Sequence, residues 1–220
     1  MNPSNHQQSE DTPRWTGSSL IGLIHGLFIY QRRIRAIANV ILPLIPSGKL
    51  LDVGCGNGEL ATYLMSKRKD IKVIGLEVFL RPNTSIPIVE YSGGSFPFAD
   101  GVYSTVLIAD TLHHIKTKER VLEECLRVSK GSVIVKDHFY RNFWEHVLLR
   151  GLDVGGNAAH GVPSVFNYFT RESWQRTLIR LKAEETYRLE EVPGQYPMPF
   201  QWLFGRKIQF IAKIERVGSE

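Results

Sequence analysis

Residues 50–58 read Leu50-Leu51-Asp52-Val53-Gly54-Cys55-Gly56-Asn57-Gly58, an apolar run followed by three closely spaced glycines. The apolar residues at 49–53 predict a buried strand, and those at 59–67 predict a helix. Glycines between a strand and a helix accept positive φ angles and let a ligand approach the backbone without a Cβ in the way. The start of the helix adds unpaired N–H groups and a partial positive charge. The stretch therefore predicts a strand, a ligand-binding turn and a helix in direct succession.

Apolar runs and amphipathic segments alternate along the rest of the chain. We expect a helix at 118–128 and further strands at 72–77, 86–91, 105–109, 132–136, 184–191 and 206–215. Such alternation predicts right-handed crossovers and a parallel sheet that helices cover on both faces. The last two strands are joined by a Pro-rich loop and are expected to pair antiparallel. We predict a three-layer, doubly wound α/β fold whose seven-stranded sheet is mostly parallel with an antiparallel C-terminal edge strand.

Composition places this 220-residue chain among globular proteins. Hydrophobic residues make up 43% and charged residues 22%, which excludes a disordered tail and a collagen-like repeat. The 27 Lys and Arg exceed the 22 Asp and Glu by five, but they are scattered, so we expect no nucleic-acid partner. Cys55 and Cys125 form neither a zinc-finger pattern nor a disulfide framework. Their use fits a reducing compartment and predicts a cytoplasmic protein.

The first 46 residues are expected to form an N-terminal tail and a helical cap on a main domain at 47–220. Residues 20–30 read LIGLIHGLFIY, which is strongly apolar but shorter than the roughly 20 residues that a membrane span needs. Glu10 and Asp11 precede this run, whereas a signal peptide begins with basic residues. The N-terminal helix is therefore compatible with a peripheral contact with a membrane, and not with a span.

Two acids flank the glycine turn and distinguish between classes of ligand. Asp52 lies two residues before the first glycine, and Glu77 ends the next expected strand, where a carboxylate can accept hydrogen bonds from ribose hydroxyls. The dinucleotide pattern G-x-G-x-x-G requires a glycine at the position of Glu59. A carboxylate there would also repel a pyrophosphate. The two acids favour a positively charged nucleoside over a dinucleotide.

Four segments carry a resemblance to a known family. Residues 52–58 (DVGCGNG) resemble its first motif, Glu77 its acidic ribose ligand, residues 96–100 (FPFAD) its LPF-D segment, and residues 105–115 (TVLIADTLHHI) its fourth strand and LHH turn. The family is the class I, Rossmann-like S-adenosylmethionine-dependent methyltransferases. The chain departs from it at Ser92, where the family often has an Asp that binds the adenine amino group. The resemblance covers residues 49–137 and implies S-adenosyl-L-methionine as cofactor. The implied cofactor-binding residues are Asp52, Gly54, Cys55, Gly56, Gly58, Glu77, Ser92, Gly93, Ala109 and Asp110.

Chemistry is expected beyond the carboxyl ends of the parallel strands, where open sheets bind their ligands. Methyl transfer from a sulfonium needs donor and acceptor held in line, and a base where the acceptor must lose a proton. Histidine suits the role of the base. We expect no metal site, because no Asn follows Asp137 to complete the ligand set of metal-dependent methyltransferases of this class. The candidate catalytic residues are His113, His114, Asp137 and His138.

A lid-like insertion is predicted at about 139–170. Its Gly/Asn-rich part, residues 151–170, is long for an ordinary loop and ends in aromatic residues. Asn157, His160 and Asn167 are candidate contacts with a substrate, and a structural loop packed on the edge strands is the alternative. The N-terminal helix around Leu27, Tyr30 and Arg33 would cover the cofactor from the other side. With residues 139–149 it would form a largely apolar pocket.

The sequence thus predicts a methyltransferase that acts on an O, N or C nucleophile of a small-molecule or lipid-like acceptor. Two alternatives remain open: an NAD(P)-dependent oxidoreductase, and a noncatalytic partner subunit with the methyltransferase fold. The identity of the acceptor and the oligomeric state do not follow from the sequence.

Overall fold

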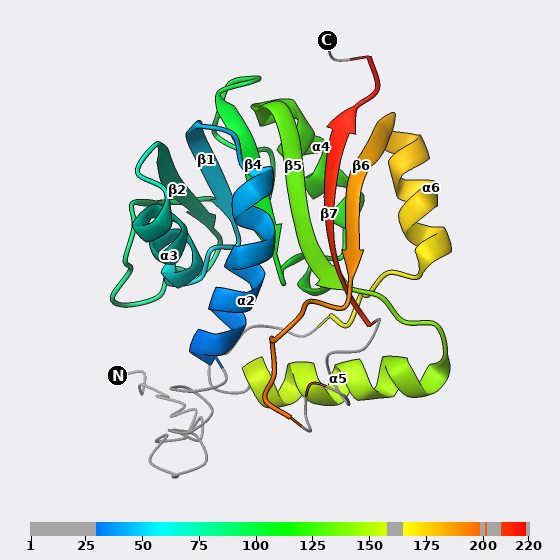
Figure 1. The fold of residues 1–220 in the computed structure, drawn as a ribbon. Coiled ribbons are helices and arrows are strands. Elements are labelled where there is room, and N and C mark those ends of the chain that lie inside the picture. The colour runs from blue at the N-terminus through cyan, green and yellow to red at the C-terminus, as the bar shows by residue number, and fades with distance from the viewer. Residues whose placement is uncertain (1–29, 158–164, 199–200, 202–207, 219–220) are drawn as a thin grey trace, which may run out of the picture.

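A computed structural model describes residues 30–157, 165–198, 201 and 208–218 (Figure 1). Seven strands form one sheet in the order β3-β2-β1-β4-β5-β7-β6. The strands are β1 (Gly48–Val53), β2 (Ile71–Glu77), β3 (Ile88–Glu90), β4 (Tyr103–Ala109), β5 (Ser129–His138), β6 (Ala183–Glu190) and β7 (Gln209–Arg216). The helices are α2 (Gln31–Ile41), α3 (Glu59–Lys67), α4 (Lys118–Val128), α5 (Phe143–Asn157) and α6 (Arg171–Leu181), with short 3-10 turns η2 (Leu42–Leu44) and η3 (Leu112–His114).

The predicted fold class is confirmed. Strands β1 to β5 pair in parallel, and β7 pairs antiparallel with both β5 and β6. One detail differs from the prediction, because β6 and not the C-terminal strand β7 forms the edge of the sheet. Phe210, Ile211 and Ala212 of β7 are fully buried, whereas β6 (AEETYRLE) carries charged residues along its length. An interior strand needs apolar residues on both faces, and an edge strand tolerates charge.

Helices cover the sheet on both faces. Ile37 and Ile41 of α2 and Leu64 of α3 pack on one face, and Leu122 of α4 and Trp174 of α6 pack on the other. The buried residues of α2 recur at helical spacing, and α2 ends at Ile41, directly before η2, which contains Pro43. These layers leave the carboxyl edge of the sheet open to the segments that follow the strands.

Helix α5 lies across this carboxyl edge, at the bottom of the sheet in Figure 1. The prediction of a loop at 151–170 is wrong for residues 151–157, which continue α5. Leu149 and Asp153, one helical turn apart, are both buried, and Leu149 packs with Tyr168 and Ile208. Packing of this inward face outweighs the cost of about 1 kcal/mol that each helical glycine adds.

Several predictions lie outside the described residues. These are the membrane contact of residues 20–29, the placement of Leu27 and the role of His160. In the part of the chain that the structure describes, no helix is both long enough and apolar enough to cross a membrane.

Candidate active site

The turn between β1 and α3 has a backbone conformation that glycine adopts without strain. Gly54 and Gly56 have φ angles of 69° and 60°, in the left-handed region where a Cβ is unfavourable. A Cβ on Gly54 would also lie 2.4 Å from the side chain of Thr111. The N–H of Gly54 donates to the carbonyl of Leu76 at 2.8 Å. The turn is thus fixed between the end of β2 and the residues after β4.

Cys55 and Gly58 belong to the same turn, and the thiol of Cys55 lies behind it. A Cβ on Gly75 of β2 would lie 2.3 Å from the Cys55 sulfur, so the side chain packs against β2. Burial, and then the charges of Asp52 and Glu77, raise the pKa of the thiol. Gly58 precedes α3 with a φ angle of 81°. The Cys55 thiol therefore points toward β2, and only the backbone of Cys55 is available to a ligand in the turn.

Glu77 ends β2 beside the glycine turn, as predicted. Its Oε2 accepts the N–H of Gly56 at 2.9 Å, and its Oε1 accepts the N–H of Val78 at 2.9 Å. A carboxylate has about four lone-pair directions, so acceptor capacity remains. Glu77 both holds the turn in place and can receive hydroxyl donors from a ligand.

Asp52 lies in β1 and is 2% exposed. Burial, and then the charge of Glu77, raise its pKa to about 7. A cation bound beside such an acid would favour its ionised form. Asp52 and Glu77 therefore form the coupled pair of acids that the sequence predicts for a cationic ligand.

Ser92 and Gly93 follow β3 at the same edge of the sheet, and both are exposed. The segment is tied to β2 because the N–H of Tyr91 donates to the Glu77 carbonyl at 3.1 Å. A Cβ on Gly93 would meet nothing within 4 Å. The role of Ser92 and Gly93 in binding adenine stays a prediction.

Asp110 follows Ala109, the last residue of β4, and its carboxylate lies between two cations. The Arg33 guanidinium donates to it at 2.6 Å, and the ammonium of Lys136 pairs with its other oxygen. Burial opposes ionisation of Asp110, but the charges of Arg33 and Lys136 outweigh burial and lower its pKa. Lys136 is fully buried in β5, and this burial lowers its pKa to about 8. Asp110 thus anchors α2 to the sheet, and its direct role in binding the cofactor stays a prediction.

His113 and Asp137 form a buried pair between η3 and the end of β5. The His113 Nδ1 lies 2.8 Å from the Asp137 Oδ1, and the two side chains are 4% and 0% exposed. Burial lowers the pKa of His113, but the Asp137 carboxylate outweighs burial and raises it to about 9. His113 therefore carries a positive charge at neutral pH and acts as a donor.

His114 and His138 lie beside this pair and stay neutral. Burial, and then the charge of His113, lower the pKa of His114. Burial, and then the charge of Lys136, lower the pKa of His138 to about 4. The structure thus brings together the four predicted catalytic residues and divides them by charge into one cationic and two neutral histidines around one acid.

Two further residues belong to this cluster and are not among the predicted catalytic residues: Asp153 of α5 and Tyr168. The Asp153 Oδ1 lies 3.5 Å from the His113 Nε2 and 3.6 Å from the His114 Nε2. The Tyr168 ring stacks on His113 with centroids 5.3 Å apart. The position of Asp153 one helical turn after Leu149 could have indicated that both side chains face inward. The prediction of a loop at 151–170 excluded that interpretation.

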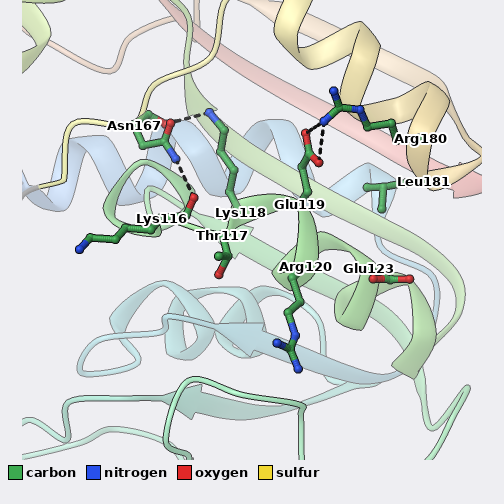
Figure 2. Close-up of a pocket in the computed structure, with 9 residues that line it drawn as sticks. All are labelled: Lys116, Thr117, Lys118, Glu119, Arg120, Glu123, Asn167, Arg180 and Leu181. Carbon is green, nitrogen blue, oxygen red and sulfur yellow. Dashed lines mark hydrogen bonds and ion pairs between the residues drawn. The ribbon is translucent and has the colours of Figure 1, made fainter.

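A polar groove of about 680 Å³ lies between α4 and α6, away from the glycine turn (Figure 2). Asn167, a predicted lid residue, lines it, and its amide donates to the carbonyls of Ile115 and Lys116 at 2.9 and 3.3 Å. The N–H of Asn167 donates to the His113 carbonyl at 2.9 Å. The Lys118 ammonium donates to the carbonyls of Asn167 and Tyr168 at 3.0 and 3.1 Å. These bonds hold the segment that carries Tyr168 against η3.

Comparisons with known proteins show which family the chain is similar to. Residues 51–135 match a family described as "Methyltransferase domain". The chain is 30% identical over 122 residues to a sarcosine/dimethylglycine N-methyltransferase of Halorhodospira halochloris, and 30% identical over 101 residues to a 27-O-demethylrifamycin SV methyltransferase of Amycolatopsis mediterranei. Residues 51–135 are therefore similar to methyltransferase domains, in agreement with the predicted resemblance to class I S-adenosylmethionine-dependent methyltransferases.

The two relatives cover this methyltransferase domain in part. The matches span 49% and 40% of the chain and only 43% and 37% of the relatives, so the chain spans less than half the length of the curated relatives it matches. A geranyl diphosphate methyltransferase shares the fold over 83% of this chain and 78% of its own, with a TM-score of 0.61 at 14% identity. The PH0226 protein of Pyrococcus horikoshii shares the fold over 85% of this chain and 91% of its own, with a TM-score of 0.62 at 14% identity.

The cofactor of this methyltransferase domain is S-adenosyl-L-methionine, and the residues present fit it. Gly54 and Gly56 place no Cβ on the turn and accept its positive φ angles. Glu77 retains acceptor capacity for ribose hydroxyls, and Asp52 and Glu77 together favour a bound cation. The glycine turn, Asp52 and Glu77 would hold the nucleoside and its charge.

Proposed function

We propose that this chain transfers a methyl group from S-adenosyl-L-methionine to an oxygen, nitrogen or carbon atom of a small-molecule acceptor. The observation that carries the proposal is the meeting of two sites at one edge of the sheet. The glycine turn and its acids follow β1 and β2, and the histidine–carboxylate cluster follows β4 and β5. The names of the two curated relatives, which denote methyltransferases of sarcosine, dimethylglycine and a rifamycin, support a small-molecule acceptor.

The cofactor, when bound, supplies an electrophilic methyl group on a sulfonium. Asp52 and Glu77 orient the nucleoside and balance its charge. Arg33 holds α2 to Asp110 at 2.6 Å, which keeps the helical cap beside the site. Orientation of donor and acceptor supplies about 7–11 kcal/mol of the reduction in barrier.

The histidine cluster acts on the acceptor. His113 does not accept a proton at neutral pH, because Asp137 raises its pKa to about 9; it positions the acceptor by donating a hydrogen bond. His114 and His138 are neutral and are the two proton acceptors available. A base of this kind contributes roughly 10²–10⁴-fold to the rate.

A lipid-like acceptor is the finer form of the proposal. Helix α5 covers the carboxyl edge, and Phe143 and Trp144 at its start are 70% and 77% exposed. Behind them Leu149, Tyr168 and Ile208 form an apolar cluster. An apolar acceptor would therefore meet apolar side chains as it approaches the site. Faster transfer to small polar acceptors than to apolar ones would remove this finer proposal.

Transfer of radiolabelled methyl from the cofactor to a panel of polar and apolar acceptors tests the function. We expect product with at least one acceptor, and a loss of roughly 10²-fold or more in kcat when the base is replaced, in His114→Gln or His138→Gln. Binding of the cofactor with no product from any acceptor would favour a noncatalytic partner subunit.

A further inference from the structure

Three side chains from two elements converge on one point beside the candidate active site: His113 and His114 of η3, and Asp153 of α5. The Asp153 Oδ1 lies 3.5 Å from the His113 Nε2 and 3.6 Å from the His114 Nε2. One possible ligand atom from each of the three residues lies within 4.8 Å of the other two. Both separations are longer than those of good hydrogen bonds.

The two separations from Asp153 match those of ligands on one metal ion. With metal–ligand bonds of about 2.0–2.2 Å, two ligands of a tetrahedral ion lie about 3.3–3.6 Å apart. Imidazole nitrogen and carboxylate oxygen are ligands that zinc and neighbouring transition metals accept. Two histidines and one carboxylate also form a ligand set that catalytic zinc sites use, with a fourth position left for water or substrate.

Asp137 supplies the outer support that metal-bound histidines need. It lies 2.8 Å from the His113 Nδ1, so the Nδ1–H donates to the carboxylate, and a metal ion would bind at Nε2 by displacing the proton that this nitrogen carries in the metal-free protein. Such a carboxylate–histidine pair orients the ring and raises its basicity as a ligand. The Asp137 side chain is fully buried, with 0% of its surface exposed. Its Oδ1 also accepts the N–H of His138 at 2.7 Å.

A second set of three, His113, Asp137 and His138, shares His113 but fits an ion less well. The His113 Nδ1 and the Asp137 Oδ1 are 2.8 Å apart and are already occupied by the bond between them. That distance belongs to a hydrogen bond and is shorter than the spacing of two tetrahedral ligands. The geometry selects the first set.

We propose that His113, His114 and Asp153 bind a divalent transition-metal ion of the zinc class, with Asp137 as the outer carboxylate. The site goes beyond the proposed function and stands without it, because it rests on the ligand geometry alone. His114 is the more exposed of the two histidines, 14% against 4%. With His114 on the metal, His138 is the histidine that remains to accept a proton.

Titration of the tag-free, metal-stripped full chain with Co²⁺ tests the site, because Co²⁺ in a tetrahedral N/O site gives intense visible absorption. We expect one Co²⁺ per chain, displaced by Zn²⁺. His114→Gln and Asp153→Asn should abolish the absorption, and Asp137→Asn should weaken binding about 10–100-fold while the absorption at saturation keeps its shape.

Two matched variants separate the proposal from its rivals. His146→Gln removes a nearby histidine of α5 outside the set and should bind Co²⁺ as the wild type does. His138→Gln should also retain binding, and loss of binding there with retention in Asp153→Asn would overturn the choice of ligands. Wild-type binding no tighter than that of His114→Gln, with both proteins folded by circular dichroism, would overturn the site altogether.

Discussion

Individual carboxylates at the carboxyl edge have opposite electrostatic surroundings. Asp52 is buried and lies near Glu77, and both its burial and the charge of Glu77 raise its pKa to about 7. Asp110 has two cations around it, and they lower its pKa despite burial. Pairs of groups whose surroundings push their pKa values apart mark functional sites. Asp52 is therefore the acid whose charge a ligand can change, and Asp110 is the one whose charge is fixed by the fold.

The pH dependence of cofactor binding follows from Asp52. At pH 6 its carboxyl is mostly protonated, and a bound cation favours the ionised form, so binding releases a proton and affinity rises with pH from about 6 to 8. Asp52→Asn should remove this rise. Calorimetry in two buffers of different ionisation enthalpy measures the proton release, and Asp100→Asn, at an exposed acid, is the control. Affinity of the wild type that is flat with pH would contradict the assignment.

Stability has a pH dependence of its own from the pair of His113 and Asp137. The pKa of His113 is raised from 6.5 to about 9, so its contribution to the free energy of unfolding is complete below pH 6.5 and is lost as the pH rises through about 9. Asp137→Asn should cost about 3–5 kcal/mol near pH 6, because it leaves a buried charge unpaired, and clearly less near pH 10. Urea unfolding at the two pH values measures this. A cost that does not change with pH would contradict it.

Among the elements, the turn from β1 to α3 depends most directly on one residue type. Gly54→Ala places a Cβ 2.4 Å from Thr111 at a φ angle of 69°, so we expect a loss of more than about 1–2 kcal/mol in stability, together with loss of cofactor binding. Gly94→Ala, which meets nothing within 4 Å, should leave both unchanged. Thermal unfolding with and without cofactor compares the two variants, and equal behaviour would contradict the account of the turn.

The sequence predicts elements well where local pattern and packing agree. The bounds of α3 and α4 and the strand before the glycine turn follow from apolar periodicity, and Glu77 follows from its place at the end of a strand. Helix α5 was not predicted from the sequence, because its glycines argue for a loop and only its contacts with Tyr168 and Ile208 argue for a helix. The same contacts bring Asp153 to the histidines. The role of Lys136, which ends an apolar run in the sequence, could not be predicted, because it depends on the ion pair with Asp110 that only the fold brings about.

For the molecule as a whole, the site is assembled from segments far apart in the sequence. The glycine turn, Asp110, the histidines, Asp137 and α5 meet only because the parallel strands end at one edge. A ligand that spans these segments stabilises the entire fold. At 100 times its Kd it adds about 2.7 kcal/mol, which is about 5–10 °C in Tm for a domain of this size. S-adenosylhomocysteine should therefore raise the Tm by this amount and NADH should not, as differential scanning fluorimetry would show. A rise in Tm with NADH and none with S-adenosylhomocysteine would favour an oxidoreductase.

The most direct measurement is calorimetric titration of S-adenosyl-L-methionine into the wild type and into the double variant Asp52→Asn/Glu77→Gln. The wild type should bind one equivalent, and the double variant, shown to be folded by circular dichroism, should bind at least about 100-fold more weakly, a loss of about 2.7 kcal/mol. Glu90→Gln, at the exposed acid opposite Glu77 on β3, should bind as the wild type does. Equal affinity of the wild type and the double variant would contradict the claim that these two carboxylates hold the cofactor.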